Sequence, residues 1–163
     1  MSDYETHTHE FPPIYDKDSH ILILGTFPSV KSREQQFYYG HPQNRFWKVL
    51  AALTDSPVPC TIPEKKALLL KNHIAVWDVI QSCDIIGSSD TSIRNVVPAD
   101  IPHILKCSAI HSIYGNGTKA CQLYDKYILS RTGMPIHPLP STSPANAAFS
   151  LERLIQSWSC IKQ

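Results

Sequence analysis

The chain has 163 residues, which is the length of a single domain. Hydrophobic residues make up 42% of it, enough for a packed core and too many for a disordered chain. The longest apolar run, Ile21–Leu24, is far shorter than the roughly 20 residues that span a bilayer, and a net charge of +1 without a basic arm gives no general signal for nucleic-acid binding.

Four segments of the sequence predict β-strands. The first 13 residues are polar, and we expect them to form a flexible tail before a single domain over residues 14–163. The strands are expected at residues 21–25, 74–80, 109–114 and 134–139, where apolar residues run together and end near Gly, Asp or Pro. Such continuous apolar runs are typical of strands that are buried on both faces.

Helical patterns with recognisable start signals separate these strands. Residues 45–53 place apolar side chains on one face. Thr61 and Glu64 have the spacing of a capping box, and Asp100 and Thr118 could each begin a helix. Ser143, followed by Pro144, predicts the start of the last helix.

The alternation of strands and helices predicts the fold class. We expect an α/β protein with three layers, α/β/α, around a central four-stranded parallel sheet. Residues 82–97 show no periodicity and are expected to form a long loop. No feature of the sequence indicates an interface between copies, so we expect a monomer.

The small and polar residues of the chain gather where the predicted strands end. Ligands bind beyond the carboxyl ends of the strands in parallel sheets. Those ends are residues 25–29, Asp78, residues 115–117 and residues 140–143. The sequence therefore predicts the binding site at this edge.

Several cofactor and metal sites are not indicated. The glycine-rich phosphate loop, the dinucleotide fingerprint and the nucleophile elbow do not occur. The five cysteines are widely spaced and form no CxxC pair. We expect no cofactor and no metal, with free thiols in a reducing, cytoplasmic environment.

Residues 37–47, FYYGHPQNRFW, combine five aromatic rings with an amide side chain. Aromatic rings near a sheet edge can stack on nucleic-acid bases, and an amide both donates and accepts hydrogen bonds. Phe46 and Trp47 also fit simple helix core, and packing alone could explain Tyr39.

Three motifs give the chain a resemblance to a known family. GTFPS at residues 25–29, HPQNRFW at residues 41–47 and LPSTSPAN at residues 139–146 occur in this order. The ordered set resembles the uracil-DNA glycosylase superfamily, and in particular its hypoxanthine-DNA glycosylase branch. The resemblance extends from residue 11 to the last helix.

The resemblance implies roles for individual residues. Asn44 corresponds to the catalytic amide of the hypoxanthine branch, and Tyr39 to the aromatic residue that stacks on a flipped base. Gly25, Thr26 and Phe27 match the loop below the base pocket. Phe27 stands where mismatch-specific uracil glycosylases have a catalytic Asn, which argues against ordinary uracil chemistry.

The same resemblance implies a DNA contact surface. The side chains expected to contact DNA are Ser29, Ser141, Thr142 and Ser143. Some polar positions near this surface also fit purely structural roles: Asn44 and Ser143 could be helix caps, Asp78 could be a buried structural carboxylate, and Arg45 could bind phosphate or lie on an exposed helix face.

The sequence thus predicts a monofunctional DNA glycosylase that flips a deaminated base, most readily hypoxanthine, out of double- or single-stranded DNA and hydrolyses its N-glycosidic bond. One alternative is a uracil or G·U mismatch glycosylase. A second is a non-catalytic module that binds single-stranded or damaged nucleic acid. A third is a hydrolase of free nucleosides.

Overall fold

The computed structural model describes residues 3–162 and contains the predicted central sheet. Four parallel strands lie in the order β3-β2-β6-β7. Their bounds are Ile74–Asp78 for β3, Ile21–Gly25 for β2, Ser112–Asn116 for β6 and Ile136–Leu139 for β7. The predicted α/β fold with a parallel sheet is confirmed.

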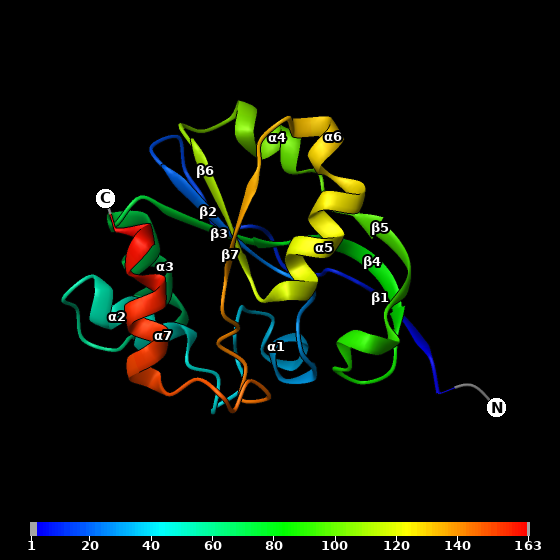
Figure 1. The fold of residues 1–163 in the computed structure, drawn as a ribbon, viewed down its shortest axis with the longest axis horizontal. Coiled ribbons are helices and arrows are strands. Elements are labelled where there is room, and N and C mark those ends of the chain that lie inside the picture. Colours follow the sequence, from blue (N-terminus) through cyan, green and yellow to red (C-terminus); the bar gives the residue numbers. More distant parts are fainter. Residues whose placement is uncertain (1–2, 163) are drawn as a thin grey trace.

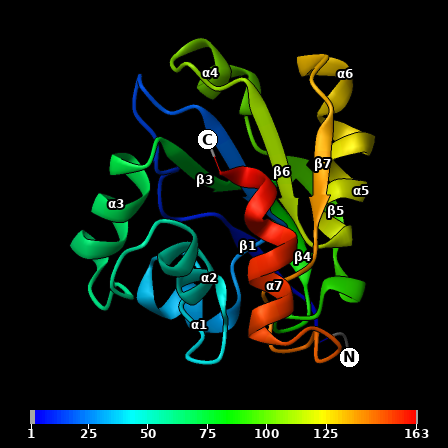
Figure 2. The same cartoon turned by 60° about the vertical axis from the view of Figure 1, so that its left-hand side comes forward.

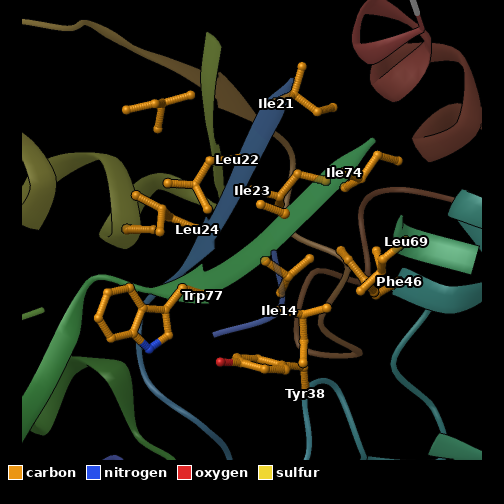
Figure 3. Close-up of a cluster of buried hydrophobic side chains, with 14 of the residues drawn as sticks. Ile14, Ile21, Leu22, Ile23, Leu24, Tyr38, Phe46, Leu69, Ile74 and Trp77 are labelled. Carbon is orange, nitrogen blue, oxygen red and sulfur yellow. The ribbon is translucent and has the colours of Figure 1, made fainter. Parts of the chain in front are cut away.

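The core lies on both faces of this sheet, as the apolar strands require. Every residue of β2 is buried. Figure 3 shows Ile21 and Ile23 on the side of Leu69 and Phe46, and Leu22 and Leu24 on the opposite side. Successive side chains of a strand point to opposite faces, so an unbroken apolar run fits a sheet covered on both sides.

Helices cover the two faces, as Figures 1 and 2 show. The side that carries α7 also carries α2 and α3, and the other side carries α5 and α6. The helix bounds are Val30–Gln35 (α1), Phe46–Leu53 (α2), Ile62–Lys71 (α3), Ile101–Lys106 (α4), Thr118–Tyr127 (α5), Leu129–Thr132 (α6) and Leu151–Trp158 (α7), with short 3₁₀ turns at Asp90–Ser92 and Ser159–Ile161.

A second sheet was missed in the sequence. Strands β1 (Glu5–Thr8), β4 (Ile80–Ile85) and β5 (Arg94–Pro98) form an antiparallel sheet in the order β1-β4-β5. The prediction of a loop over residues 82–97 is therefore wrong. These strands are partly exposed and their buried positions do not alternate regularly, so the sequence shows no apolar alternation there.

The N-terminal segment is also part of the fold. The prediction of a flexible tail over residues 1–13 is wrong for the described part, because Glu5–Thr8 pairs with β4 and both His9 and Phe11 are buried. The Phe11 ring packs edge-on against Tyr38 with 4.7 Å between ring centroids. The first two residues of the predicted tail lie outside the described residues.

The helix start signals were correct in part. Thr61 and Glu64 form the predicted capping box, and the Asp100 side chain accepts the backbone N–H of His103. Helix α5 begins at Thr118, but the capping position is Gly117.

The predicted start of the last helix at Ser143 is wrong, because α7 begins at Leu151 after the cap residue Ser150. The carbonyls of Ser143, Asn146 and Phe149 accept hydrogen bonds from the Arg45 guanidinium. These contacts hold the intervening segment as a loop.

In residues 3–162, no helix is long and apolar enough to cross a membrane.

Candidate active site

A cavity of about 160 Å³ opens at the carboxyl edge of the central sheet. This is the edge at which β6 and β7 end in Figure 2. The ends of four strands supply its walls: Gly25 of β2, Asp78 of β3, Asn116 of β6 and the loop 141–143 after β7. Every residue that the sequence predicted for the site borders this cavity: Gly25, Thr26, Phe27, Ser29, Tyr39, Asn44, Ser141, Thr142 and Ser143.

The Asn44 side chain is held by its oxygen atom. Oδ1 accepts the backbone N–H of Phe46 at 3.0 Å and the hydroxyl of Thr142 at 2.8 Å. A backbone N–H can only donate, so the amide atom that it bonds must be the oxygen, Oδ1. The nitrogen Nδ2 is therefore the other end of the amide, which these two hydrogen bonds do not use. Asn44 therefore bonds to the first residue of α2 but is not its N-cap, because that position is Arg45. Its Nδ2 group is the end of the amide that is left for a ligand in the cavity that Asn44 borders.

Thr142 connects Asn44 to Asn116, the last residue of strand β6. Its hydroxyl accepts from Asn116 Nδ2 at 3.0 Å, and its backbone N–H donates to Asn116 Oδ1 at 3.0 Å. Thr142 is fully buried. The predicted DNA contact through this side chain does not fit, because the hydroxyl is bonded on both sides within the protein; Thr142 instead positions Asn44.

Arg45 fixes the loop that follows β7. Its backbone N–H donates to the Thr142 carbonyl at 3.1 Å, and its guanidinium group donates to the carbonyls of Ser143 and Asn146 at 2.8 and 3.0 Å. Neither expected role, phosphate binding or simple exposure, describes it. Arg45 ties the loop 141–149 to the segment that carries Asn44.

Two aromatic residues border the cavity. One face of the Tyr39 ring packs on Phe46, with ring centroids 3.9 Å apart and an interplanar angle of 21°. Tyr39 has a left-handed backbone conformation with φ of 53°. The Phe27 ring lies under the Arg33 guanidinium at 5.8 Å and meets the His9 ring edge-on at 6.2 Å.

The Tyr39 hydroxyl reaches the floor of the cavity. It is buried and has no partner within normal hydrogen-bond geometry among the described groups, although the Asn116 side chain lies close enough to affect it. Burial raises the pKa of Tyr39, the negative charge of Asp78 raises it further, and the side chain of Asn116 opposes the shift. The phenol therefore stays protonated and can act as a donor.

Asp78 and His9 form a buried pair beside this hydroxyl. Asp78 Oδ2 lies 2.8 Å from His9 Nε2, and both side chains are almost completely buried. The sequence suggested a buried structural carboxylate as one role for Asp78, and its burial agrees with that role. His9 was missed, because a polar segment with two histidines carries no signal that one of them enters the core.

The rim adds two residues that the sequence analysis missed. Ser88 and Asp90, from the turn between β4 and β5, border the cavity together with Ser29. Partial desolvation at the rim raises the pKa of the Asp90 carboxyl, Lys119 opposes the shift and Asp78 adds to it. Within residues 3–162, no three His, Cys, Asp or Glu side chains are grouped so as to hold a metal ion.

Comparison with known sequences decides the family. The family model of the uracil DNA glycosylase superfamily matches residues 12–160, which is nearly the whole chain. The chain belongs to this superfamily. A relative from Methanosarcina acetivorans, named hypoxanthine DNA glycosylase, is 35% identical over 145 residues, which cover 88% of this chain and 90% of the relative. Another of that name, from Methanosarcina barkeri, is 36% identical over 86 residues, 52% of this chain and 54% of the relative.

A solved structure extends the agreement to the fold of the superfamily. The solution NMR structure of a protein from Methanosarcina acetivorans, described as a candidate uracil DNA glycosylase, superposes with a TM-score of 0.79 at 32% identity. The match covers 93% of both chains. The resemblance stated from the three motifs is thus confirmed.

Proposed function

We propose that this chain is a monofunctional DNA repair glycosylase that removes hypoxanthine from deoxyinosine sites. The observation that carries the proposal is the Asn44 amide, whose oxygen is fixed by Phe46 and Thr142 while its N–H donors are presented at a cavity. The names of the two Methanosarcina relatives support hypoxanthine as the base. The described chain acts as one glycosylase domain.

The reaction requires a nucleotide that has left the base stack. A base inside a duplex cannot be reached, so the enzyme flips the target nucleotide into its pocket at a cost of a few kcal/mol. The bond between the sugar C1′ and the base N9 then breaks, and its electron pair leaves with the base. Water adds to C1′ and loses a proton, which leaves an abasic sugar and a neutral base.

Asn44 stabilises the charge that develops on the departing base. Its Nδ2 group donates a hydrogen bond to the purine as negative charge accumulates. Because Oδ1 is fixed by two donors, the amide needs little reorganisation during the reaction. The removal of one such preorganised donor costs about 10²–10³ in rate in other enzymes.

The remaining predicted residues bind the substrate. Tyr39 and Phe27 supply ring surfaces for the base, and the backbone at Gly25 and Thr26 forms the wall below it. Hydroxyl and backbone N–H groups of the rim serines contact the flanking phosphates; these residues are Ser29, Ser141 and Ser143. Double- or single-stranded DNA with a deaminated base is the partner, and the monomeric state and cytoplasmic location stay predictions.

A panel of oligonucleotides tests the proposal. Duplexes that carry one hypoxanthine, uracil, xanthine or G·T mismatch are incubated with excess enzyme, and abasic sites are cleaved with alkali and counted. We expect hypoxanthine to be released fastest. Release of uracil alone would replace the proposal with a uracil or G·U mismatch glycosylase.

Two further outcomes would point to functions outside DNA base excision. Binding without any product, lost in Tyr39→Ala but kept in Asn44→Ala, would indicate a non-catalytic binding module. Turnover of free inosine without preference for DNA would indicate a nucleoside hydrolase.

A further inference from the structure

The floor of the cavity contains a buried acid that has no part in the proposed mechanism. Asp78 ends strand β3 and borders the cavity. Its carboxylate has two oxygens with different surroundings. Oδ2 is bonded to His9 Nε2 at 2.8 Å, whereas no described group donates a hydrogen bond to Oδ1. Oδ1 is not among the fully buried atoms that lack a partner, so it keeps contact with open space, where a ligand can supply the missing donor.

Asp78 Oδ1 lies beside Gly25, and both residues border the cavity. A Cβ atom added to Gly25 would lie 2.5 Å from Asp78 Oδ1 and 3.0 Å from the Tyr39 hydroxyl. Gly25 itself borders the cavity. A side chain at this position would collide with the carboxylate oxygen in its present place.

His9 determines which oxygen of the carboxylate stays free. Its Nδ1 atom is buried and has no partner among the described residues. A proton on Nδ1 would be a buried donor without an acceptor, so we assign the proton to Nε2, which then donates to Asp78 Oδ2. His9 follows directly after β1 in the N-terminal segment. It lies before residues 12–160, the part of the chain that matches the family model of the superfamily.

We propose that the His9–Asp78 pair determines the base specificity of the site, with His9 holding the carboxylate so that Asp78 Oδ1 accepts the N1–H of a deaminated purine. This inference rests on the proposed function and names the group that reads the base. His9 is a positioning residue, because it acts through Asp78.

The chemistry of the purine edge explains why a carboxylate suits this role. Hypoxanthine carries a hydrogen on N1, next to the C6 carbonyl. Adenine carries a lone pair on N1, next to an amino group. A carboxylate can only accept hydrogen bonds, so it binds the N1–H of hypoxanthine and repels the N1 lone pair of adenine. The pair thus separates a deaminated base from the normal base that it derives from.

A cycle of two enzymes and two substrates tests the contact. Wild type and Asp78→Asn are compared on duplexes with hypoxanthine or 1-methylhypoxanthine, which lacks the N1–H, in single-turnover excision. In Asp78→Asn the amide oxygen still accepts from His9, so the amide NH₂ faces the cavity and opposes the N1–H. We expect the variant to lose about 10- to 100-fold on hypoxanthine and at most about threefold on 1-methylhypoxanthine.

The same cycle is measured as binding to uncleavable 2′-fluoroarabino forms of both nucleotides, so that a poorly excised substrate still gives a result. An equal loss on both bases in excision and in binding would overturn the proposal. Wild type that excises no hypoxanthine would instead contradict the proposed function, so the two failures are distinct.

Two variants of His9 test its positioning role. Gln can donate through its amide nitrogen as His9 does through Nε2, and Leu cannot. We expect His9→Gln to keep excision of hypoxanthine within about threefold and His9→Leu to lose about tenfold, with 1-methylhypoxanthine unaffected in both. Thermal unfolding shows whether each variant folds. If His9→Leu does not fold, the comparison of wild type with Asp78→Asn tests the proposal in its place. Equal effects of Gln and Leu would show that His9 only fills space.

Discussion

The two sides of the cavity differ in how completely their polar groups are satisfied. On the side that we call the amide side, Asn44, Thr142 and Asn116 bond to one another, and the Asn44 Nδ2 group is left over. On the carboxylate side, formed by Asp78, His9 and Tyr39, both His9 Nδ1 and the Tyr39 hydroxyl are buried without partners among the described groups.

This difference separates two tasks that a glycosylase must perform. A satisfied network is rigid, and rigidity suits a group that must stabilise a transition state at no cost of reorganisation. Free hydrogen-bonding groups suit recognition, since the ligand supplies the missing partners. We therefore assign rate to the amide side and base choice to the carboxylate side.

The variant Gly25→Ala tests the carboxylate side of this comparison, and we expect it to lower the rate of excision strongly. In Gly25→Ala, the new methyl group would lie 2.5 Å from Asp78 Oδ1, so the carboxylate or the backbone must move. A displacement of about 1 Å in a reacting complex can cost about 10²-fold in rate. We expect about that loss in excision of hypoxanthine.

Binding of the variant to undamaged duplex provides the control, since the rim is unchanged. Excision within about threefold of wild type, well short of the loss that a displaced reacting group brings, would show that the floor at Gly25 is not in contact with the base.

A smaller effect is expected when Thr142, on the amide side, loses its hydroxyl. Thr142→Val keeps the shape of the side chain and removes the hydroxyl that bonds both Asn44 and Asn116. We expect excision to fall about tenfold, the size of one net hydrogen bond, for hypoxanthine and 1-methylhypoxanthine alike. Thr54→Val, which removes a hydroxyl bonded to the Leu50 carbonyl at the far end of α2, is the matched control and should leave the rate unchanged.

The smallest effect is expected at the rim. Asp90→Asn removes a negative charge at the rim where we propose that DNA phosphates bind, and we expect duplex binding to tighten about threefold at low salt. The pKa of Asp90 is raised, so its carboxyl takes up a proton at a higher pH than an ordinary one. Wild-type affinity should therefore approach that of Asp90→Asn as pH falls through this pKa, whereas a constant ratio would contradict the prediction.

The central sheet could be predicted from the sequence for a physical reason, and most of the amide side from the resemblance to the superfamily. Strands buried on both faces, such as Ile21–Gly25, are apolar throughout, and the capping box at Thr61 is a local pattern. Asn44 and residues 141–143 lie in compact motifs within the region that matches the superfamily.

The missed features depend on contacts between distant parts of the chain. His9 meets Asp78 across 69 positions, and β1 is formed by polar residues that pair with β4. The loop before α7 has the local pattern of a helix start, and only Arg45, 98 positions before Ser143, shows why it is not one. No local pattern in the sequence encodes these pairings.

The central claim is that the Asn44 amide acts on a base held in this cavity, and one measurement tests it most directly. Single-turnover excision of hypoxanthine is compared for wild type, Asn44→Ala and Gln43→Ala, the last being the exposed neighbouring amide. The account predicts a loss of about 10²–10³ for Asn44→Ala with duplex binding largely kept, and a wild-type rate for Gln43→Ala. Equal excision by wild type and Asn44→Ala would contradict it.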